Sequence, residues 1–560
     1  MIICGVKITH DAGVALIEDG KLVFSVEMEK LGNAARHSRI EDLSEIFDVL
    51  REYGYRSSDV DLFAIDGWRK TERFKPWHGQ QVRVQLAPYR RGFVTVDPLR
   101  PHNFNISDFN YVSFPHYTGH VVGGYLTSPF AERGEDSYVL SWDGAMFPYL
   151  YYVQPRTGDV QSLGPVFNFL GDAYHTISQR FAPFDAPLEF PATLSLPGKI
   201  MAYIARGVAQ PELLDEMQRC YDQTEQELFR KIPLFDDEVF NEPLGRQFLE
   251  LYSQKLEVTG VHDVDALATW HAFLERLLLV ALEHKLSEQP WPANNLIFVG
   301  GCALNIKWNR TLRDSGLVKE FWVPPFPNDA GAAIGAACCA WTTQRGMTPI
   351  SWSVYSGPEL KPSAAIDGWT ARQCSTRDLA GLLFESHEPV AVLHGRAELG
   401  PRALGNRSLF ASPVDARMKQ RLNDIKRRED YRPVAPICLE HRAKEIFEPG
   451  CPDPYMLFEH DVKPDWIERI PAVCHEDGTA RVQTVNREQN PVVFEVLTEF
   501  ERISGIPLVC NTSANLPGKG FFPDVASAMG WGQVNHVWSN DVCYSNVNRN
   551  KGEFCLRREE

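Results

Sequence analysis

The sequence predicts a protein of mixed α/β class with two domains. Its 560 residues exceed the roughly 250–300 residues that one hydrophobic core can serve. A β-prone run, an acidic turn and a hairpin occur twice in the first part of the chain, a pattern that indicates internal duplication. A second succession of expected strands and helices begins near Pro389. We therefore expect one domain at residues 1–345, a linker at 346–368 and an α/β domain at 369–560.

The two copies of the repeated pattern each consist of a strand followed by a hairpin. In the first copy, at residues 1–26, the β-prone runs of the hairpin flank Asp19-Gly20, a pair typical of tight turns. In the second copy, at residues 137–163, Asp143 follows the first strand and Thr157-Gly158-Asp159 separates the runs of the hairpin. The match between the copies predicts a duplicated first domain.

Hydrophobic periodicity predicts the other elements. Apolar residues recur at helical spacing in Asp265–Leu286, so the first domain is expected to carry a helical insertion at about residues 207–290. The apolar run Asn295–Val299 is typical of a buried strand, and the small-residue run Ala332–Trp341 is typical of a buried helix. In the second domain we expect the strands Val390–Leu393, Ala480–Val485 and Pro507–Cys510 and the helices Asp415–Arg428 and Val492–Ile503.

Composition and charge limit the classes of partner. The formal net charge is −16, and an acidic chain is a poor general binder of nucleic acid or of anionic membranes. No apolar run reaches the roughly 18 residues that would span a bilayer, and the first residues lack the pattern of a signal peptide. The 12 cysteines are scattered without a CxxC pair, as is typical of reduced cysteines. We expect a cytoplasmic protein with neither nucleic acid nor membrane as partner; the sequence indicates no particular oligomeric state.

Two histidines and two aspartates indicate a metal site. His116 and His120 are four residues apart, so they would share one face of a helix. Asp143 follows an expected strand and Asp329 precedes an expected helix, and such turns gather at one edge of α/β sheets. Two imidazoles and two carboxylates would suit iron, manganese or zinc. Two unrelated histidines near the start of a helix are the alternative, because this spacing is common.

Two further turns carry polar or glycine residues. His10 and Asp11 follow the first expected strand, where a histidine can act as a base, although an ordinary turn pair is the alternative. Gly300-Gly301 follows another expected strand and leads to Asn305 at the start of an expected helix. This arrangement lets backbone N–H groups approach a nucleotide or a phosphate, with a tight structural turn as the alternative.

The segment from Arg396 to Arg432 is basic within this acidic chain. It contains ten Arg or Lys and five Asp or Glu residues, a net charge of +5. Guanidinium groups bind phosphate oxygens in pairs, and neighbouring glycines let main-chain N–H groups take part. A solvated basic helix is the alternative; it fits residues 417–421 well and fits Arg402 and Arg407 less well, because these two lie among Gly, Pro and apolar residues. Later strand ends are expected to add the donors His475, Arg481 and Asn511-Thr512-Ser513.

Together these features resemble one family, the antibiotic O-carbamoyltransferases, which include the nodulation-protein-U and hydroxymethylcephem types. The resemblance covers nearly the whole chain and is most specific in HGRAELGPRALGNRS at residues 394–408. The first 30 residues are most similar to the branch that acts on ansamycin macrolactams and related polyketides. The other matching motifs are His10-Asp11 with Glu27 and Glu29, His116 with His120, Pro197–Met201, Gly300–Asn305, Asn328–Gly331, Tyr431–Pro436, Pro471–Val485 and Asn511–Ser513.

The resemblance implies a fold and a reaction. The first domain would be a duplicated domain of the actin/Hsp70/sugar-kinase type, and the second would be a YrdC-like α/β domain. In such enzymes the second domain forms carbamoyl-adenylate from carbamoyl phosphate and ATP, the latter with Mg²⁺. The first domain then transfers the carbamoyl group to a hydroxyl of a small-molecule acceptor, here a macrolactam, polyketide or similar natural product in antibiotic biosynthesis.

The resemblance also implies the roles of individual residues. The residues expected to bind carbamoyl phosphate are Lys426, Arg432, Arg481 and Ser513. Those expected to bind nucleotide are Arg402, Asn406, Arg407, His475, Asn511, Gly300, Gly301 and Asn305. Those expected to hold the metal, Fe(II), are His116, His120, Asp143 and Asp329. His10, with Asp11, would lie at the site of transfer.

The chain departs from the family pattern in a few places. The departures are Cys474, Ala514, Gly518–Gly520 and the turn after Asp143.

Three other functions are alternatives to carbamoyl transfer. A small-molecule kinase would not explain the arginine-rich second half. Carbamoylation in tRNA or protein maturation conflicts with the acidic charge and with the lack of CxxC pairs. A catalytically inactive interaction protein would not need the set Lys426, Arg432, Arg481 and Ser513.

Overall fold

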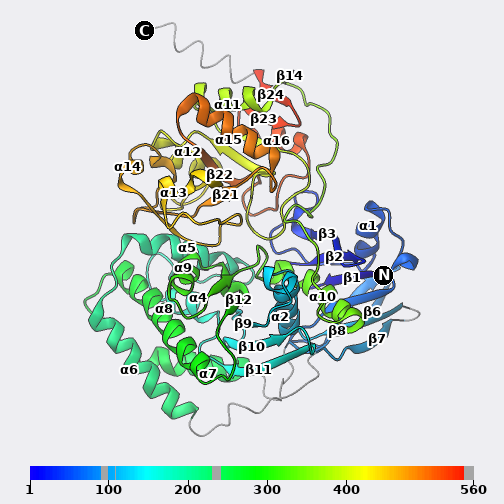
Figure 1. Ribbon diagram of the computed structural model, residues 1–560, viewed down its shortest axis with the longest axis vertical. Coiled ribbons are helices and arrows are strands. Elements are labelled where there is room, and N and C mark those ends of the chain that lie inside the picture. Colours follow the sequence, from blue (N-terminus) through cyan, green and yellow to red (C-terminus); the bar gives the residue numbers. More distant parts are fainter. Residues whose placement is uncertain (90–98, 107–108, 230–240, 548–560) are drawn as a thin grey trace. The chain divides into compact units, whose positions relative to one another are not determined.

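The structure, a computed structural model, divides the chain into two compact units (Figure 1). The residues that it describes are 1–89, 99–106, 109–229 and 241–547. Unit 1 comprises Met1–Met28 and His37–Ser353, and unit 2 comprises Glu29–Arg36 and the chain from Val354. Both units are of mixed α/β class, as the sequence predicts.

The segment Glu29–Arg36 differs from the expected division, because it packs with unit 2 although the sequence places it in the first domain. The Lys30 ammonium is buried and donates to the carbonyl oxygens of Glu398 and Gly400, at 2.6 and 2.8 Å. The backbone N–H of Arg36 donates to the carbonyl oxygen of Gly518 at 3.0 Å. These bonds are made between residues more than 300 positions apart, so no local pattern could have predicted them.

Unit 1 contains two main sheets with the same succession of strand pairings. The first has the order β3-β2-β1-β4-β8-β7 and the second the order β11-β10-β9-β12-β13. In each sheet, three strands that are consecutive along the chain pair antiparallel. The earliest of the three, β1 or β9, also pairs in parallel with a later strand, β4 or β12. The repeat of strand and hairpin expected from the sequence is therefore present. The bounds are β1 Ile2–Lys7, β2 Gly13–Glu18, β3 Lys21–Glu27, β4 Leu62–Asp66, β7 His102–Ile106, β8 Phe109–Phe114, β9 Ser137–Ser141, β10 Tyr149–Gln154, β11 Asp159–Pro165, β12 Asn295–Val299 and β13 Glu320–Trp322.

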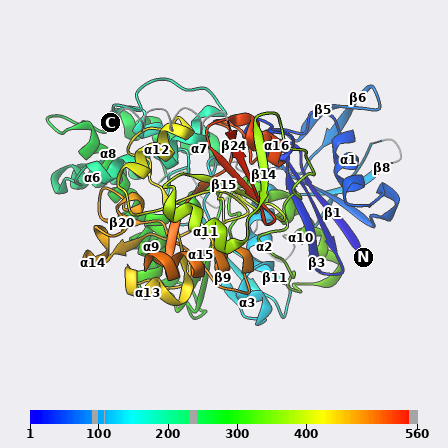
Figure 2. The same ribbon diagram turned by 90° about the horizontal axis from the view of Figure 1, so that it is seen from above.

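Two helices of small residues pack against each other and against these sheets (Figures 1 and 2). They are α2 (His116–Leu126), which contacts β9 and β12, and α10 (Ala332–Arg345), which contacts β1, β2 and β4. A Cβ on Gly335 of α10 would lie 2.5 Å from the carbonyl oxygen of Gly119 in α2. A Cβ on Gly5 of β1 would lie 2.0 Å from the carbonyl oxygen of Ala333. The missing side chains thus let α10 approach a helix and a strand closely, and this fixes the polar residues at their ends.

The remaining elements of unit 1 are a helical lobe and short connections. The lobe consists of α6 (Pro211–Leu228), α7 (Asn241–Lys255) and α8 (Asp263–Ser287), as expected from the periodicity; residues 230–240 of the expected insertion lie outside the described residues. Within the described ranges, no helix combines the length and apolar character needed to cross a bilayer. The other elements are α1 Ser44–Glu52, α3 Pro129–Glu132, α4 Ala173–Ser178, α5 Leu196–Tyr203, α9 Ile306–Asp314 and the paired strands β5 Glu72–Trp77 and β6 Gln80–Gln85.

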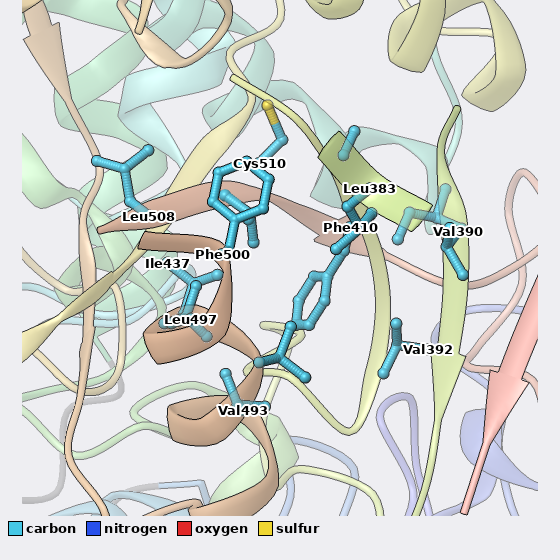
Figure 3. Packing of buried hydrophobic residues seen from close by; sticks show 14 of the residues in the cluster. Leu383, Val390, Val392, Phe410, Ile437, Val493, Leu497, Phe500, Leu508 and Cys510 are labelled. Carbon is cyan, nitrogen blue, oxygen red and sulfur yellow. The ribbon is translucent and has the colours of Figure 1, made fainter. Parts of the chain in front are cut away.

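Unit 2 is built on an eight-stranded sheet with the order β14-β24-β23-β15-β16-β22-β17-β21. Its core lies between this sheet and helices (Figure 3). Val493, Leu497 and Phe500 of α15 recur at helical spacing, so they face the sheet together. The strand bounds are β14 Trp369–Gln373, β15 Val390–Leu393, β16 Arg407–Ala411, β17 Ala435–Leu439, β21 Gln483–Val485, β22 Leu508–Ser513, β23 His536–Ser539 and β24 Val542–Asn546. The helices are α11 Thr376–Glu385, α12 Arg417–Lys426, α13 Ala443–Ile446, α14 Pro464–Ile467, α15 Pro491–Ser504 and α16 Val525–Trp531.

The expected strand Ala480–Val485 is wrong as a single element. Its first residue closes β20 (Thr479–Ala480), which belongs to a small sheet with β18 (Phe447–Glu448) and β19 (His460–Val462). Its last residues form β21, which pairs in parallel with β17 in the large sheet. The chain changes sheets at Arg481, and this interruption frees the Arg481 side chain from a strand position.

We expect Gly5→Ala to destabilise the protein, because the new methyl group would meet the backbone of α10. Overpacking of this kind costs about 1–3 kcal/mol of unfolding free energy. Urea denaturation followed by circular dichroism would measure it. The matched control is Gly198→Ala in α5, where a Cβ meets nothing within 4 Å; that variant should be as stable as the parent or slightly more so. Equal midpoints for the two variants would contradict the packing argument.

Candidate active site

Charged side chains of unit 1 gather where parallel strands end. β1 ends at Lys7 and β4 ends at Asp66, and these two strands pair in parallel. β8, which is parallel to β4, leads through Pro115 into His116 at the start of α2. The carboxyl ends of parallel strands meet at one edge of a sheet. The side chains that follow them are therefore brought together although they lie far apart in the sequence.

The four residues expected to hold a metal lie together. One ligand atom from each of His116, His120, Asp143 and Asp329 falls within 4.8 Å of all the others. The Nε2 atoms of the two histidines are 3.1 Å apart. The Oδ1 atom of Asp329 lies 3.2 Å from Nε2 of His116 and 3.5 Å from Nε2 of His120, and Oδ2 of Asp143 lies 3.9 Å from Nε2 of His116.

This arrangement fits a divalent transition metal. Both carboxylate oxygens of Asp329 are buried, and neither accepts a hydrogen bond of good geometry within the described part of the chain. Oδ2 lies 3.1 Å from the Lys7 ammonium, whereas Oδ1 faces, among the described side chains, only the Nε2 atoms of His116 and His120. Because buried polar atoms normally have a partner, Oδ1 and the two ring nitrogens fit a cation bound between them. Two imidazole nitrogens and two carboxylate oxygens are the donors that zinc, iron or manganese accepts.

Residues around the four ligand candidates orient them. His116 Nδ1 lies 2.7 Å from Asp66 Oδ2, which directs the other ring nitrogen toward the cluster. Asp143 accepts hydrogen bonds from the backbone N–H of Gly301, at 2.8 Å, and from the hydroxyl of Tyr89, at 2.5 Å. Burial lowers the pKa of His116, but the carboxylates of Asp66 and Asp329 outweigh it and raise that pKa to about 9.

His10 lies at the rim of this cluster. Its Nε2 atom is 3.0 Å from Asp329 Oδ2 and 3.9 Å from Asp11 Oδ2. Asp11 is held in turn by His37, whose Nδ1 atom is 2.7 Å from Asp11 Oδ1. The His10 ring meets the rings of Trp68 and Phe190 edge to face, with centroids 5.0 and 5.1 Å apart. Phe190 is 50% exposed, so His10 borders solvent on the side of an apolar surface.

The glycine pair and Asn305 are engaged by the fold. Gly300 adopts a φ of 90°, and a Cβ there would lie 2.3 Å from the carbonyl oxygen of Trp142. The N–H of Gly301 is used by Asp143, as described above. The Asn305 side chain accepts hydrogen bonds from the N–H groups of Lys307 and Trp308 and so caps α9. These three residues support the metal candidate and the helix, and their expected contact with nucleotide stays a prediction.

In unit 2 the arginines of the basic segment repel one another. Burial lowers the pKa of each, and neighbouring cations lower it further. The pKa of Arg402 falls to about 10, with Arg432 and Arg36 nearby, and that of Arg428 falls to about 9, with Arg432 and Arg481 nearby. The pKa of Arg481 lies well below its ordinary value, from burial and from Arg402 and Arg432. Because arginine stays charged at neutral pH, these shifts mean that like charges are held close together.

Two carboxylates offset this positive charge only in part. Asp453 faces Arg402 and Arg481, and Glu429 faces Arg428 and Arg432. The Nε atoms of Arg402, Arg428 and Arg481 are buried and make no hydrogen bond within the described ranges. Donors of this kind, with surplus positive charge, fit a polyanion.

Lys426 and Ser513, both expected to bind carbamoyl phosphate, are in direct contact. The Lys426 ammonium is buried and donates to the carbonyl oxygens of Ser513 and Asn515, at 2.7 and 2.9 Å. The Ser513 hydroxyl donates to Asn515 Oδ1 at 2.6 Å. Burial lowers the pKa of Lys426 well below its ordinary value, and Arg428 and Arg36 lower it further. Lys426, Ser513 and Asn515 thus form one hydrogen-bonded cluster, of which the sequence indicated only Lys426 and Ser513.

Three of the expected nucleotide-binding residues are engaged in hydrogen bonds within unit 2, and their expected contact with nucleotide stays a prediction. The Arg407 side chain is 1% exposed or less and donates to the carbonyl oxygens of His394, Asn406 and Gly395, at 2.7 to 3.0 Å. The Asn406 amide donates to the carbonyl oxygen of Arg396, at 2.7 Å. The Asn511 amide donates to Ala403 O and Gln483 Oε1. The fourth residue, His475, lies close to Arg481 in the sequence. Its Nδ1 atom is 2.9 Å from Thr479 Oγ1.

Several residues of these sites have no role in the sequence prediction. They are Lys7, Asp66, Tyr89, Arg36, Asp453 and Asn515. A charged residue that closes an apolar strand, such as Lys7 or Asp66, is the one recognisable pattern among them. The others are brought into place by contacts between distant segments.

Comparisons with known proteins agree over nearly the whole chain. The family model described as carbamoyltransferase N-terminus matches residues 2–95 and 95–338, and the one described as carbamoyltransferase C-terminus matches residues 381–537. The chain belongs to the carbamoyltransferase family. The expected assignment to the O-carbamoyltransferases is confirmed at this level of family and enzyme class.

Curated relatives align over nearly their full length. Nodulation protein U of Bradyrhizobium diazoefficiens is 44% identical over 97% of this chain and 97% of its own, and that of Rhizobium tropici is 45% identical over 97% and 96%. The 3'-hydroxymethylcephem-O-carbamoyltransferase of Amycolatopsis lactamdurans is 31% identical over 93% and 94%. Among solved structures, T. kodakarensis HypF aligns over 61% of this chain and 47% of its own with 14% identity and a TM-score of 0.31, which is too low to support an argument.

We expect Arg481→Met to raise the melting temperature of the ligand-free protein, because it removes one of several partly buried cations that repel one another. The gain should be about 1 kcal/mol of unfolding free energy. Pyrophosphate, a probe for the anion site, should raise the melting temperature of the parent more than that of the variant. Thermal unfolding with and without pyrophosphate measures both effects. Arg417→Met is the control, because that side chain is 91% exposed; a response like that of Arg481→Met would contradict the placement of Arg481 in an anion site.

Proposed function

We propose that this carbamoyltransferase joins carbamoyl phosphate and ATP into carbamoyl-adenylate and then transfers the carbamoyl group to a hydroxyl of a small-molecule acceptor. One observation carries the proposal. The partly buried arginines of unit 2 hold more positive charge than the carboxylates beside them offset, and the buried Nε atoms of Arg402, Arg428 and Arg481 make no hydrogen bond within the described ranges. Carbamoyl phosphate and ATP with Mg²⁺ are polyanions, so bringing them together needs such a surplus.

In the first step, carbamoyl phosphate and water give carbamate and phosphate. A carbamate oxygen then attacks the α-phosphorus of ATP, the bond to the β-phosphate breaks, and pyrophosphate leaves. Arg402, Arg432 and Arg481 would bind the phosphate oxygens, since their guanidinium groups can donate in pairs. The Lys426 ammonium would fix Ser513 and Asn515 beside them, given its short contacts to both.

In the second step, the acceptor oxygen attacks the carbonyl carbon of carbamoyl-adenylate. The bond from that carbon to the adenylate oxygen breaks, AMP leaves, and the hydroxyl proton passes to His10. The position of His10 at the rim, 3.0 Å from Asp329 and bordering solvent, supports this role. His116, His120, Asp143 and Asp329 would hold Fe(II), which supplies a Lewis acid for phosphate or carbonyl oxygens.

The finer fold assignment and the acceptor are also proposals. The shared strand order of the two sheets in unit 1 supports an actin/Hsp70/sugar-kinase type of domain, and we propose a YrdC-like fold for unit 2. The exposed ring of Phe190 beside His10 supports an acceptor with an apolar body, such as a hydroxylated macrolactam or polyketide in antibiotic biosynthesis.

We expect the two steps to be separable by single substitutions. With ATP and carbamoyl phosphate, the parent protein should release pyrophosphate, whereas a kinase would form ADP. Arg481→Met should reduce pyrophosphate release at least about 100-fold, because several phosphate contacts of a preorganised site are lost. His10→Ala should keep pyrophosphate release and lower carbamoyl transfer about 10²–10⁴-fold, as is typical for the loss of a general base.

Pyrophosphate release and acceptor carbamoylation, the latter measured by mass spectrometry over a panel of hydroxylated compounds, would be followed in parallel. Arg417→Met serves as the control for a lost surface arginine. Normal pyrophosphate release by Arg481→Met would contradict the role of Arg481 in adenylate formation. Loss of pyrophosphate release in His10→Ala would contradict the assignment of His10 to the transfer step alone.

A further inference from the structure

A buried lysine stands beside the metal candidate of unit 1. The Lys7 side chain is 1% exposed, and its ammonium lies 3.2 Å from Asp66 Oδ2 and 3.1 Å from Asp329 Oδ2. It also lies 4.2 Å from the centroid of the Trp68 ring. Burying an ammonium is costly unless opposite charges and hydrogen bonds compensate for the lost water. The buried lysine at the end of β1 is therefore expected to have a specific role.

Lys7 reaches the metal candidate at two points. Asp329 divides its two oxygens, with Oδ1 toward His116 and His120 and Oδ2 toward Lys7 and His10. Asp66 uses one oxygen, Oδ2, for both Lys7 and His116 Nδ1. The lysine thus contacts one expected ligand directly and another through the carboxylate that orients it.

The charges around this group do not balance without a further cation. Three carboxylates, those of Asp66, Asp143 and Asp329, face the cluster. In the described part of the chain, Lys7 is the only lysine or arginine that forms an ion pair with any of them. Two negative charges remain when the histidines are neutral. One divalent cation would neutralise them, and a second would leave a surplus of positive charge in a buried place.

We propose that Lys7 is a positioning residue that acts as a permanent counter-charge and limits the site to one divalent cation. It holds Asp329 Oδ2 and Asp66 Oδ2 on the side where a second metal ion would otherwise be bound. This inference rests on the metal site of the proposed function. It adds that the affinity of the site for metal is set below its maximum by a fixed ammonium, because the lysine opposes any cation bound to the same carboxylate.

The alternative is an ion pair that only stabilises the fold. In that case the loss of Lys7 would weaken the protein equally with and without metal. A counter-charge behaves differently. Without Lys7, no lysine or arginine of the described residues forms an ion pair with the three carboxylates, so a cation should bind more tightly and restore more stability.

The test compares Lys7→Met with the parent, both as full chains freed of metal with a chelator, and uses Zn(II) as the probe. We expect the metal-free variant to melt at a lower temperature, because Asp66 and Asp329 lose their partner. Zn(II) should bind the variant at least tenfold more tightly and raise its melting temperature by more than that of the parent. Calorimetry and elemental analysis should give one Zn(II) per chain at this site for the parent, and two would contradict the limit set by Lys7.

Two further variants make the outcome specific. Lys30→Met removes another buried lysine, one that donates to carbonyl oxygens in unit 2; it should lower the melting temperature without changing Zn(II) affinity. Asp66→Asn keeps the shape of the side chain but weakens its hold on His116, and it should lower Zn(II) affinity about 10–100-fold.

The inference is overturned if Lys7→Met binds Zn(II) with unchanged or weaker affinity, or if its loss of stability is the same at all Zn(II) concentrations. If the parent chain binds neither Zn(II) nor Fe(II), the proposed metal site is wrong, and so is the inference about Lys7. Pyrophosphate release from ATP and carbamoyl phosphate, which we assign to unit 2, would still occur in that case. The failure of the metal site can therefore be told apart from failure of the adenylation proposal.

Discussion

Buried charge that the protein does not fully compensate is the constraint on which both candidate sites depend. Unit 2 holds Arg402, Arg432 and Arg481 close enough to repel one another. Unit 1 holds carboxylates that Lys7 offsets only in part. Each arrangement costs folding free energy, since uncompensated charges are unfavourable away from water. Unit 2 has an excess of positive charge, which a bound anionic reactant would offset. Unit 1 has an excess of negative charge, which a bound cation would offset.

The packing of small residues places the charges of unit 1. Asp329 begins the turn into α10, and Lys7 ends β1, so their contact depends on how closely that helix approaches that strand. Gly5 permits the approach, because a Cβ there would meet the backbone of Ala333, and Gly335 likewise lets α10 approach α2, which carries His116. The chemistry of the site thus follows from packing several residues away. A one-carbon change in the core could therefore move a ligand by a few tenths of an ångström.

The sequence predicts the parts of the fold and sites that depend on local pattern. His116 and Asp329 are recognisable because strands and helices place their ends together at the edge of a sheet. Arg407 looks like its neighbours in sequence, but its donors are used by carbonyl groups whose positions only the folded sheet defines. The break within Ala480–Val485 likewise depends on pairing with two separate sheets. Lys7 could not be linked to its partners, because they lie 59 and 322 positions away along the chain.

The opposite charges of the two sites also bear on the order of the proposed reaction. A carbamoyl-adenylate carries a phosphate charge, which the three carboxylates near His10 would repel while no cation is bound. If a divalent cation and Lys7 together balanced those carboxylates, the repulsion would disappear, and the adenylate could lie beside His10. Acceptance of the intermediate would then depend on the metal being present. A buried lysine in place of a second metal ion would keep that balance neutral, so the phosphate would be neither repelled nor held too tightly for AMP to leave.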